Sequence, residues 1–222
     1  LSQQLEYHIL GNHLFANGKA LTFIGCYLQG KEAERYLDMG LNLLDRQVPE
    51  QFLSDGAHFE LSPMYHEIVL WDLLELINLA KTSENAKLSK YLPYWSAVAE
   101  KAIRWLRCMI HPDGEISFFN DAAIGIAASP KEIFSYAQSL GLLVADHLPE
   151  MVTHKVSGYS RLTLSRYSLI MDHANVGPDY LPGHAHADTL SFELSVGNQR
   201  VFVNSGTSLY GVSSERLRQR KT

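Results

Sequence analysis

The chain has 222 residues, of which 46% are hydrophobic and 19% charged, and its formal net charge is −5. This composition is typical of a globular protein with a substantial core and excludes a disordered chain. The negative charge argues against a general nucleic-acid binder, which normally carries a basic stripe. No apolar run approaches the ~20 residues that a membrane-spanning helix needs.

The first part of the chain, up to about residue 140, has its apolar residues at helical spacing. Favoured capping residues predict helix starts near Asn12, Ser62 and Asn120. The segments 31–47 and 91–110 have one polar side, which is typical of helices on the outside of a bundle. A further helix is expected after residue 129, where the sequence Ser-Pro-Lys-Glu forms a capping box.

These helices carry a degenerate repeat. The segments SDGAHFELSP from Ser54 and PDGEISFFND from Pro112 share an Asp-Gly turn, then aromatic residues, then a capping residue. A unit that returns every 50 to 58 residues predicts stacked antiparallel helical hairpins, as in an α/α toroid or solenoid. If the three capped helices are all inner ones, their N-termini open at one mouth, where they would favour an anion.

The second part of the chain changes to alternating, β-rich patterns. Runs typical of strands cover 159–164, 167–174, 189–196 and 199–205, and Gly197-Asn198 predicts a two-residue hairpin turn. The predicted organisation is therefore α+β: a helical domain over 1–145, a linker over about 146–157, and the N-terminal part of a β domain over 158–222.

Two pairs of polar residues lie near predicted helix starts, Asn12-His13 and Tyr65-His66, and both pairs would face the same mouth. Each also has a structural interpretation. Asn12 fits a helix cap, a single histidine in a helix is more often a core or solvated residue, and a tyrosine beside a cap is more often a packing residue.

A histidine cluster precedes the third predicted strand, in the segment GHAHADTLSFEL. On extended backbone His184 and His186 would point to the same side, as paired imidazoles do at a metal. The predicted hairpin brings Asn204 roughly opposite, although a neutral amide is a poor zinc ligand. Asp188 fits either an acceptor that orients an imidazole or a cap at the strand start.

Four segments in this order, GNHLFANGKAL, DGAHFELSPMYHE, GHAHADTLSFEL and VFVNSGTSLYG, resemble the heparinase II/III family of polysaccharide lyases and its alginate-lyase relatives. The resemblance covers nearly the whole chain from about Leu5. It implies an incomplete α/α toroid followed by the first strands of an antiparallel β-sandwich, with the active site in the cleft between them.

The resemblance also implies roles for individual residues. Asn12 would neutralise the substrate carboxylate, with His13 beside it; Tyr65 would be the general acid and often also the base; His184 would reach into the cleft from the β domain. Further substrate contacts are expected from two neighbours of these motifs, His66 and Tyr210.

A structural zinc ion is the one cofactor that the resemblance implies, with His186 as a ligand and Asn204 where the family commonly has an aspartate. The remaining histidine ligand would lie in an HNT segment beyond Thr222, so a complete site is not expected within this chain. No redox cofactor is required.

The activity implied is β-elimination on an acidic polysaccharide that contains uronic acid, such as a glycosaminoglycan, alginate or a capsular polymer. The C5 proton is removed, the glycosidic O4 is expelled, and groups that bind the carboxylate stabilise the charge that develops. His13 and His184 are alternative bases to Tyr65. A bacterial lyase of this kind would be periplasmic or secreted, although no signal peptide is visible; the oligomeric state stays open.

Two other functions remain open. A glycoside hydrolase on the same toroid would need two facing carboxylates, for which the candidates are Glu60, Glu67, Asp72 and Asp121. The second is a noncatalytic protein that has kept the fold and serves in glycan binding or assembly. Two of these carboxylates facing each other in the cleft, with Tyr65 turned away, would favour the hydrolase. Failure of Asn12, Tyr65 and His184 to converge would favour the noncatalytic protein.

Overall fold

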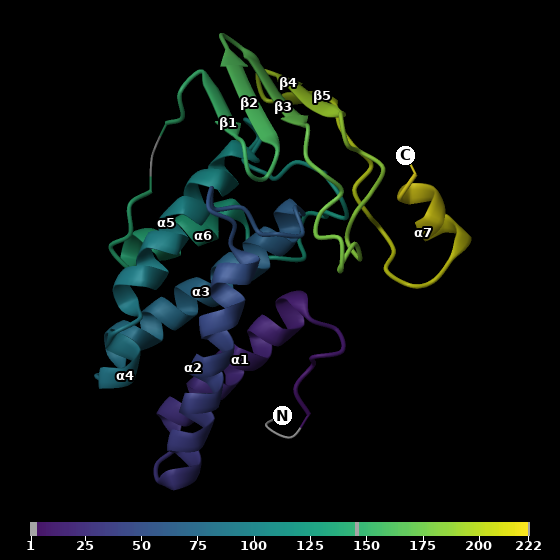
Figure 1. Ribbon diagram of the computed structural model, residues 1–222. Helices are drawn as coiled ribbons and strands as arrows, with labels where there is room; N and C mark the ends of the chain where they lie inside the picture. Colours follow the sequence, from purple (N-terminus) through teal and green to yellow (C-terminus); the bar gives the residue numbers. More distant parts are fainter. Residues whose placement is uncertain (1–3, 145–146, 222) are drawn as a thin grey trace.

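A computed structural model describes residues 4–144 and 147–221, and it consists of a layer of helices followed by one antiparallel sheet (Figure 1). The helices of the first layer are α1 (Gly11–Tyr27), α2 (Lys31–Gln51), α3 (Pro63–Thr82), α4 (Ala86–Ser89), α5 (Leu92–Cys108) and α6 (Pro130–Ser139). The strands are β1 (Met151–His154), β2 (Tyr159–Leu164), β3 (Tyr167–Asp172), β4 (Phe192–Val196) and β5 (Gln199–Phe202), and a short helix α7 (Ser214–Gln219) follows them.

The helices pack as neighbouring hairpins, with α1 against α2 and α3 against α5 (Figure 1). The first pair approaches closely because glycine stands at the contact: a Cβ on Gly25 would lie only 2.5 Å from the backbone nitrogen of Leu37. Helix α3 lies at the centre, and its buried leucines, such as Leu70 and Leu73, join one core that extends into α2, α5 and α6. The amphipathic patterns of α2 and α5 therefore predicted their positions correctly.

The sequence repeat corresponds to a repeated structure, but only in its turns. The isolated β-bridges Phe52–His58 and Ile110–Ile116 enclose the two Asp-Gly turns. The glycines of these turns, Gly56 and Gly114, have φ of +97° and +93°, a left-handed backbone that glycine adopts without strain. The two bridges are related by the same offset of 58 residues as the sequence segments.

The predicted helix at Asn120 is wrong. Helices begin near two of the predicted starts, at Gly11 and Pro63, but residues 120–128 form turns, and the next helix begins at Pro130 behind the predicted capping box. Asn120 has φ of +57°, and its side chain donates to the carbonyl oxygen of Leu61 (3.0 Å) and accepts from the backbone N–H of His186 (3.1 Å). Its amide therefore joins three loops and caps no helix.

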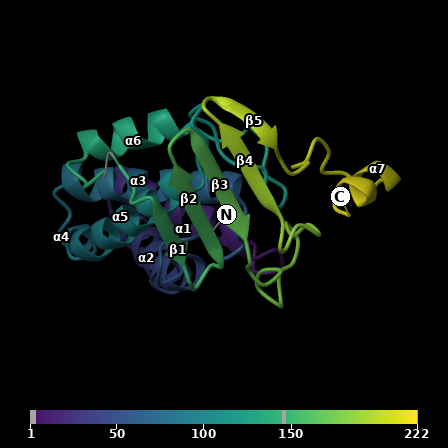
Figure 2. The ribbon, with the colours of Figure 1, turned by 90° about the horizontal axis from the view of Figure 1, so that it is seen from above.

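The five strands form a meander in the order β1-β2-β3-β4-β5, with every neighbouring pair antiparallel, which Figure 2 shows from above. The predicted turn at Gly197-Asn198 joins β4 to β5. Strand β1 pairs with β2 from Met151, so the sheet starts inside the segment predicted as a linker. The predicted boundary at residues 145–146 lies outside the described residues.

One face of the sheet packs on the ends of the helices. Tyr159 and Ile170 from the sheet are fully buried against Trp105 and Phe119 of the helical part. Polar contacts reinforce this interface: the indole N–H of Trp105 donates to the hydroxyl of Ser157 (3.0 Å). The sheet and the helices are thus fixed relative to each other.

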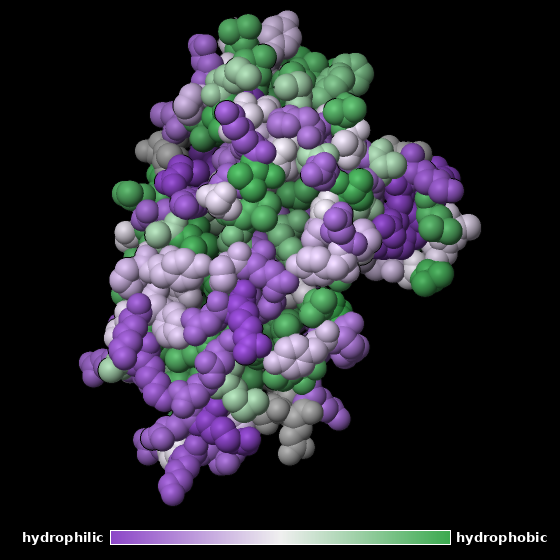
Figure 3. All heavy atoms as spheres, viewed as in Figure 1, coloured by the Kyte–Doolittle hydropathy of each residue, from purple (hydrophilic) through white to green (hydrophobic). Residues whose placement is uncertain are grey.

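The other face of the sheet is exposed and rich in apolar side chains, several of which appear over the sheet in Figure 3. Exposed examples are Leu164, Tyr167, Phe192 and Phe202. Helical hairpins followed by such a sheet are the expected incomplete toroid and beginning of a β-sandwich. Within the described ranges, no helix has the length and apolar character needed to cross a membrane.

Candidate functional site

Tyr65 and His184, which are far apart in the sequence, lie in direct contact where the two layers meet. Their ring centroids are 3.8 Å apart and the rings are tilted by 41°. Tyr65 stands in the first turn of α3, which Pro63 begins with its pre-set φ. His184 lies in the irregular segment that leads from β3 to β4. The segment between β3 and β4 therefore places an imidazole at the N-terminus of α3 in the other layer.

His184 is held between two buried carboxylates. Its Nδ1 is 2.5 Å from Asp121 Oδ2, and its Nε2 is 2.9 Å from Glu60 Oε2. The side chains of Glu60 and Asp121 are 1% and 0% exposed, and that of His184 is 20% exposed. Burial by itself disfavours the charged ring, but the two carboxylates outweigh it and raise the pKa of His184 to about 9. The imidazole is therefore protonated at neutral pH in the free protein.

Tyr65 is held in its protonated form. Burial and the nearby charge of Asp121 raise the pKa of Tyr65 to about 12, against the lowering effects of a hydrogen bond with Tyr210 and the charge of Arg216. Tyr210 donates its hydroxyl to the backbone oxygen of Asp121 (3.1 Å), and the guanidinium of Arg216 lies 4.9 Å from its ring centroid. The predicted substrate contact Tyr210 is thus part of the same cluster.

The start of α1 closes the other side of this cluster. A Cβ on Gly11 would overlap Glu60 Oε1 and lie 3.1 Å from Leu181, and the side chain of Gln51 donates to the Gly11 carbonyl (2.7 Å). Asn12, the next residue, is partly exposed and does not cap the helix: the N-cap is Leu10, which makes no side-chain hydrogen bond. The first turn of α1, with its unpaired N–H groups, therefore lies beside Glu60 and His184.

Two further predicted site residues have their recorded contacts outside this cluster. His13 is exposed, and its Nδ1 lies 3.7 Å from Glu6. His66 is fully buried: its Nδ1 accepts from the backbone N–H of His58 (3.1 Å), and its Nε2 faces the carbonyl of Ala102 (3.0 Å). Burial lowers the pKa of His66 to about 3. His66 is a neutral core residue with no nitrogen left for a substrate, so we correct its assignment as a substrate contact.

The predicted metal ligands do not form a zinc site with the residues described. His186 is buried and its Nε2 has no partner among them, as a ligand nitrogen would require, and burial lowers its pKa to about 4. Asn204, however, directs its backbone and side-chain N–H groups to Glu193 Oε1 (3.1 and 3.5 Å). Within residues 4–144 and 147–221 no group of three or more His, Cys, Asp or Glu is placed to hold a metal. Among the described residues, His186 supplies one candidate ligand nitrogen and Asn204 is engaged by Glu193, so the zinc site stays a prediction.

Sequence reasoning missed the partners of His184. Glu60 and Asp121 were considered only as hydrolase carboxylates, whereas in the structure both contact the imidazole. Glu60 lies two residues before Ser62 and Asp121 directly follows Asn120, so their closeness to the two predicted caps was the available signal. Arg216 and Arg220 from the region of α7 were also missed; Arg220 donates to the carbonyl oxygens of Ala185 and Pro182 (3.1 and 3.2 Å) on either side of His184.

Comparisons with known proteins agree with this architecture. The model of the heparinase II/III N-terminus matches residues 2–140, and that of the heparinase II/III-like C-terminal region matches residues 146–222. A heparin-sulfate lyase of Bacteroides stercoris is 26% identical over 96% of this chain and 34% of its own length. One from Bacteroides thetaiotaomicron is 30% identical over 52% of this chain and 17% of its own.

Solved structures give the same result for the fold. A crystal structure of heparinase III superposes with a TM-score of 0.79 at 23% identity, covering 96% of this chain and 38% of that one. The heparan sulfate lyase HepC of Pedobacter heparinus gives 0.71 at 18% identity, with 99% and 36% covered. This chain spans about a third of the length of these relatives. With both family models matched in register over its two layers, the chain belongs to the heparinase II/III family.

Proposed function

We propose that the protein containing this chain is a polysaccharide lyase that cleaves an acidic, uronate-containing glycan by β-elimination. The observation that carries this proposal is the contact between Tyr65 and His184, with His184 held between Glu60 and Asp121. General acid–base catalysis requires two adjacent groups whose surroundings give them different pKa values, so that one can donate a proton and the other can accept one. The relatives named as heparin-sulfate lyases support this class of substrate.

In the proposed reaction His184 takes the C5 proton and Tyr65 gives a proton to O4. The electron pair of the C5–H bond forms the C4–C5 double bond, the C4–O4 bond breaks, and O4 leaves as a hydroxyl with the phenolic proton. Asp121 orients the imidazole through Nδ1, and we propose Nε2 as the nitrogen that accepts the C5 proton. In the free protein Nε2 lies 2.9 Å from Glu60 Oε2, so the proposed step requires the substrate to take the place of this carboxylate beside Nε2. The imidazolium and the phenolate are then restored by proton exchange with water.

The carboxylate of the uronate is proposed to lie at the first turn of α1. Asn12 is partly exposed there, beside helix N–H groups that favour an anion. Binding of the carboxylate would stabilise the enediolate-like charge that develops when the C5 proton leaves. Arg216 and Arg220 supply positive charge close by, which the net charge of −5 does not. The substrate is neither oxidised nor reduced overall in this elimination, so the proposed reaction needs no redox cofactor.

The two rival functions are less well supported. Glu60 and Asp121 do lie on two sides of one group, but both are buried and in contact with His184, against whose ring Tyr65 packs. A glycoside hydrolase needs two carboxyl groups that both reach the glycosidic bond. A noncatalytic glycan-binding protein would not require a partly buried tyrosine in contact with a charged imidazole.

The experiment is a lyase assay of the full-length native protein on a panel of uronate polymers, including heparan sulfate, unsulfated heparosan and alginate. We expect an unsaturated uronate at the new non-reducing end, detected by its ultraviolet absorbance and by mass spectrometry. Products that carry added water instead would establish hydrolysis. Binding without any cleavage would establish the noncatalytic alternative.

A further inference from the structure

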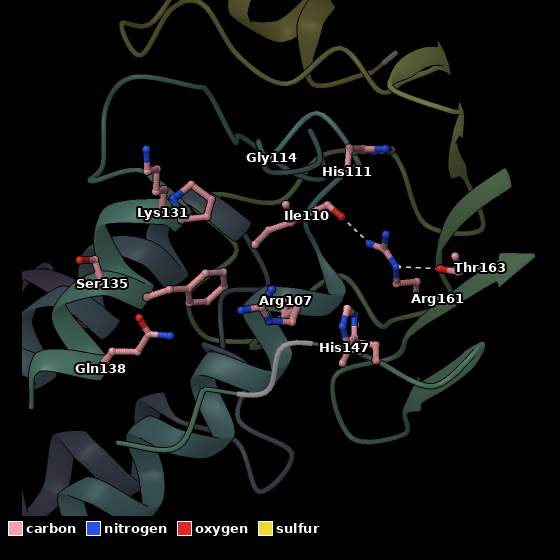
Figure 4. Close-up of a pocket in the computed structure, with 13 residues that line it drawn as sticks. Arg107, Ile110, His111, Gly114, Lys131, Ser135, Gln138, His147, Arg161 and Thr163 are labelled. Atoms are coloured by element: carbon pink, nitrogen blue, oxygen red, sulfur yellow. Dashed lines mark hydrogen bonds between the residues drawn. The ribbon is translucent and has the colours of Figure 1, made fainter. Parts of the chain in front are cut away.

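A cavity of about 690 Å³ opens on another part of the molecule, between α5, α6 and β2 (Figure 4). Arg107 and Ile110 line it from the end of α5 and the residues that follow, Lys131, Ser135 and Gln138 from α6, and Arg161 and Thr163 from β2. None of its lining residues belongs to the cluster around Tyr65 and His184. Its volume is within the range of about 300–1,000 Å³ that small-ligand sites have.

The lining is basic. Three residues that are always charged at neutral pH, Arg107, Lys131 and Arg161, contribute to it, and the described lining residues include no aspartate or glutamate. This contrasts with the chain as a whole, whose formal net charge is −5. A concave surface with one sign of charge concentrates ligands of the opposite sign.

Arg161 is the most informative of the three. It is only 9% exposed, and within the part of the chain that the structure describes no carboxylate lies at ion-pair distance from it. Its Nε donates to Thr163 Oγ1 (3.2 Å), and its Nη1 donates to the carbonyls of Cys108 (3.1 Å) and Ile110. These bonds fix the guanidinium at the wall of the cavity, as Figure 4 shows, but they do not neutralise its charge.

A buried charge without a counter-ion is costly, and proteins normally pair it. We propose that the partner is a ligand: the cavity binds an anionic group, a sulfate or a carboxylate, of a glycan chain. That the anion belongs to a glycan rests on the proposed function. That the cavity binds an anion does not depend on it. Ser135 and Gln138 from α6 add side-chain hydrogen-bond donors for the oxygens of such a group.

The test is a calorimetric titration at low and high salt, with inorganic sulfate and a sulfated uronate-containing tetrasaccharide as probes. The protein carries Tyr65→Phe throughout, so that cleavage is slow on the time scale of the titration. The first variant, Gln138→Glu, places a negative charge in the cavity at an exposed position without changing side-chain size. The second, Lys131→Gln, removes an exposed positive charge from it. Neither change disturbs the buried bonds of Arg161, so both proteins should fold.

Matched controls change the charge by the same amount at exposed positions outside the cavity, Gln199→Glu and Lys90→Gln. We expect each cavity variant to weaken one saccharide-binding component about two- to fivefold, the range that a single nearby charge gives at the surface, with a smaller effect at high salt. The controls should leave that component unchanged. Equal weakening by cavity and control variants would overturn the proposal.

The probes separate the source of the anion. A glycan ligand is supported if the tetrasaccharide binds and Gln138→Glu weakens that binding. If inorganic sulfate binds and the tetrasaccharide does not, the glycan is not the ligand. Because the titration uses a protein that turns over only slowly, its failure leaves the lyase proposal intact. Absence of lyase activity would likewise leave the titration interpretable.

Discussion

The ring of Tyr65 rests on the ring of His184 at a centroid distance of 3.8 Å, and the two residues reach this contact from different layers of the fold. The pKa of the phenol is raised to about 12 and that of the imidazole to about 9, for different physical reasons: burial for the first, two carboxylate partners for the second. An acid that keeps its proton thus contacts a group that can lose one within an accessible pH range.

Tyr65→Phe removes the phenolic proton while keeping the ring that packs on His184. We expect kcat to fall by about 10²- to 10⁴-fold, the range that general acid–base groups contribute, with an unchanged circular dichroism spectrum. The measurement is the initial rate of unsaturated product formation. Tyr27→Phe, at a tyrosine that is 85% exposed, is the matched control and should retain full activity. Substantial residual activity in Tyr65→Phe would remove Tyr65 from the reaction.

The rate should rise with pH, because His184 acts as a base only after it loses a proton. With a pKa of about 9 for His184, kcat/KM should increase from pH 7 toward 9 and then level off below the pKa of Tyr65, about 12. Asp121→Asn removes one of the carboxylates that stabilise the charged ring, so the rising limb should move to lower pH while the maximal rate falls. A rate that is flat from pH 6 to 9 would contradict His184 as the base.

Glu193→Ala should destabilise the connection between the sheet and the helical part. The buried carboxylate of Glu193 contacts His111 Nε2 (2.7 Å) and accepts the backbone N–H groups of Phe118 (2.8 Å) and Asn204 (3.1 Å). Removing it leaves the buried His111 and the two partly buried N–H groups without their acceptor, which costs about 3–5 kcal/mol by analogy with broken buried pairs. Denaturant unfolding measures this loss. Glu215→Ala, at the surface ion pair with Arg218, should leave the denaturant midpoint close to that of the unchanged protein.

Gly25→Ala should loosen the contact of α1 with α2. The added methyl group would lie 2.5 Å from the backbone nitrogen of Leu37 and 2.7 Å from its Cα, so the two helices must separate. We expect a loss of about 1–3 kcal/mol in the free energy of unfolding, the usual cost of overpacking, despite the better helix propensity of alanine. Gly211→Ala meets no atom within 4 Å and should be close to neutral. Equal effects of the two changes would contradict the packing argument.

Local patterns predicted the elements well where one physical rule acted alone. The amphipathic faces of α2 and α5, the capping box before α6 and the turn at Gly197-Asn198 are all confirmed. Asn120 shows where this reasoning fails. Asparagine is both a good helix cap and one of the residues that tolerate positive φ. At Asn120, partners distant in the sequence, Leu61 and His186, decide that it adopts positive φ in a loop.

The sequence by itself determined the class of fold, the change from helices to strands, and two residues of the candidate site, Tyr65 and His184, through the motifs that contain them. Only the tertiary structure decided that these two rings touch, that Glu60 and Asp121 charge the imidazole, and that His66 is buried in the core. The reason is physical. Periodicity and capping depend on neighbours a few residues away, whereas protonation and accessibility depend on burial and charge contributed by every layer that packs around a side chain.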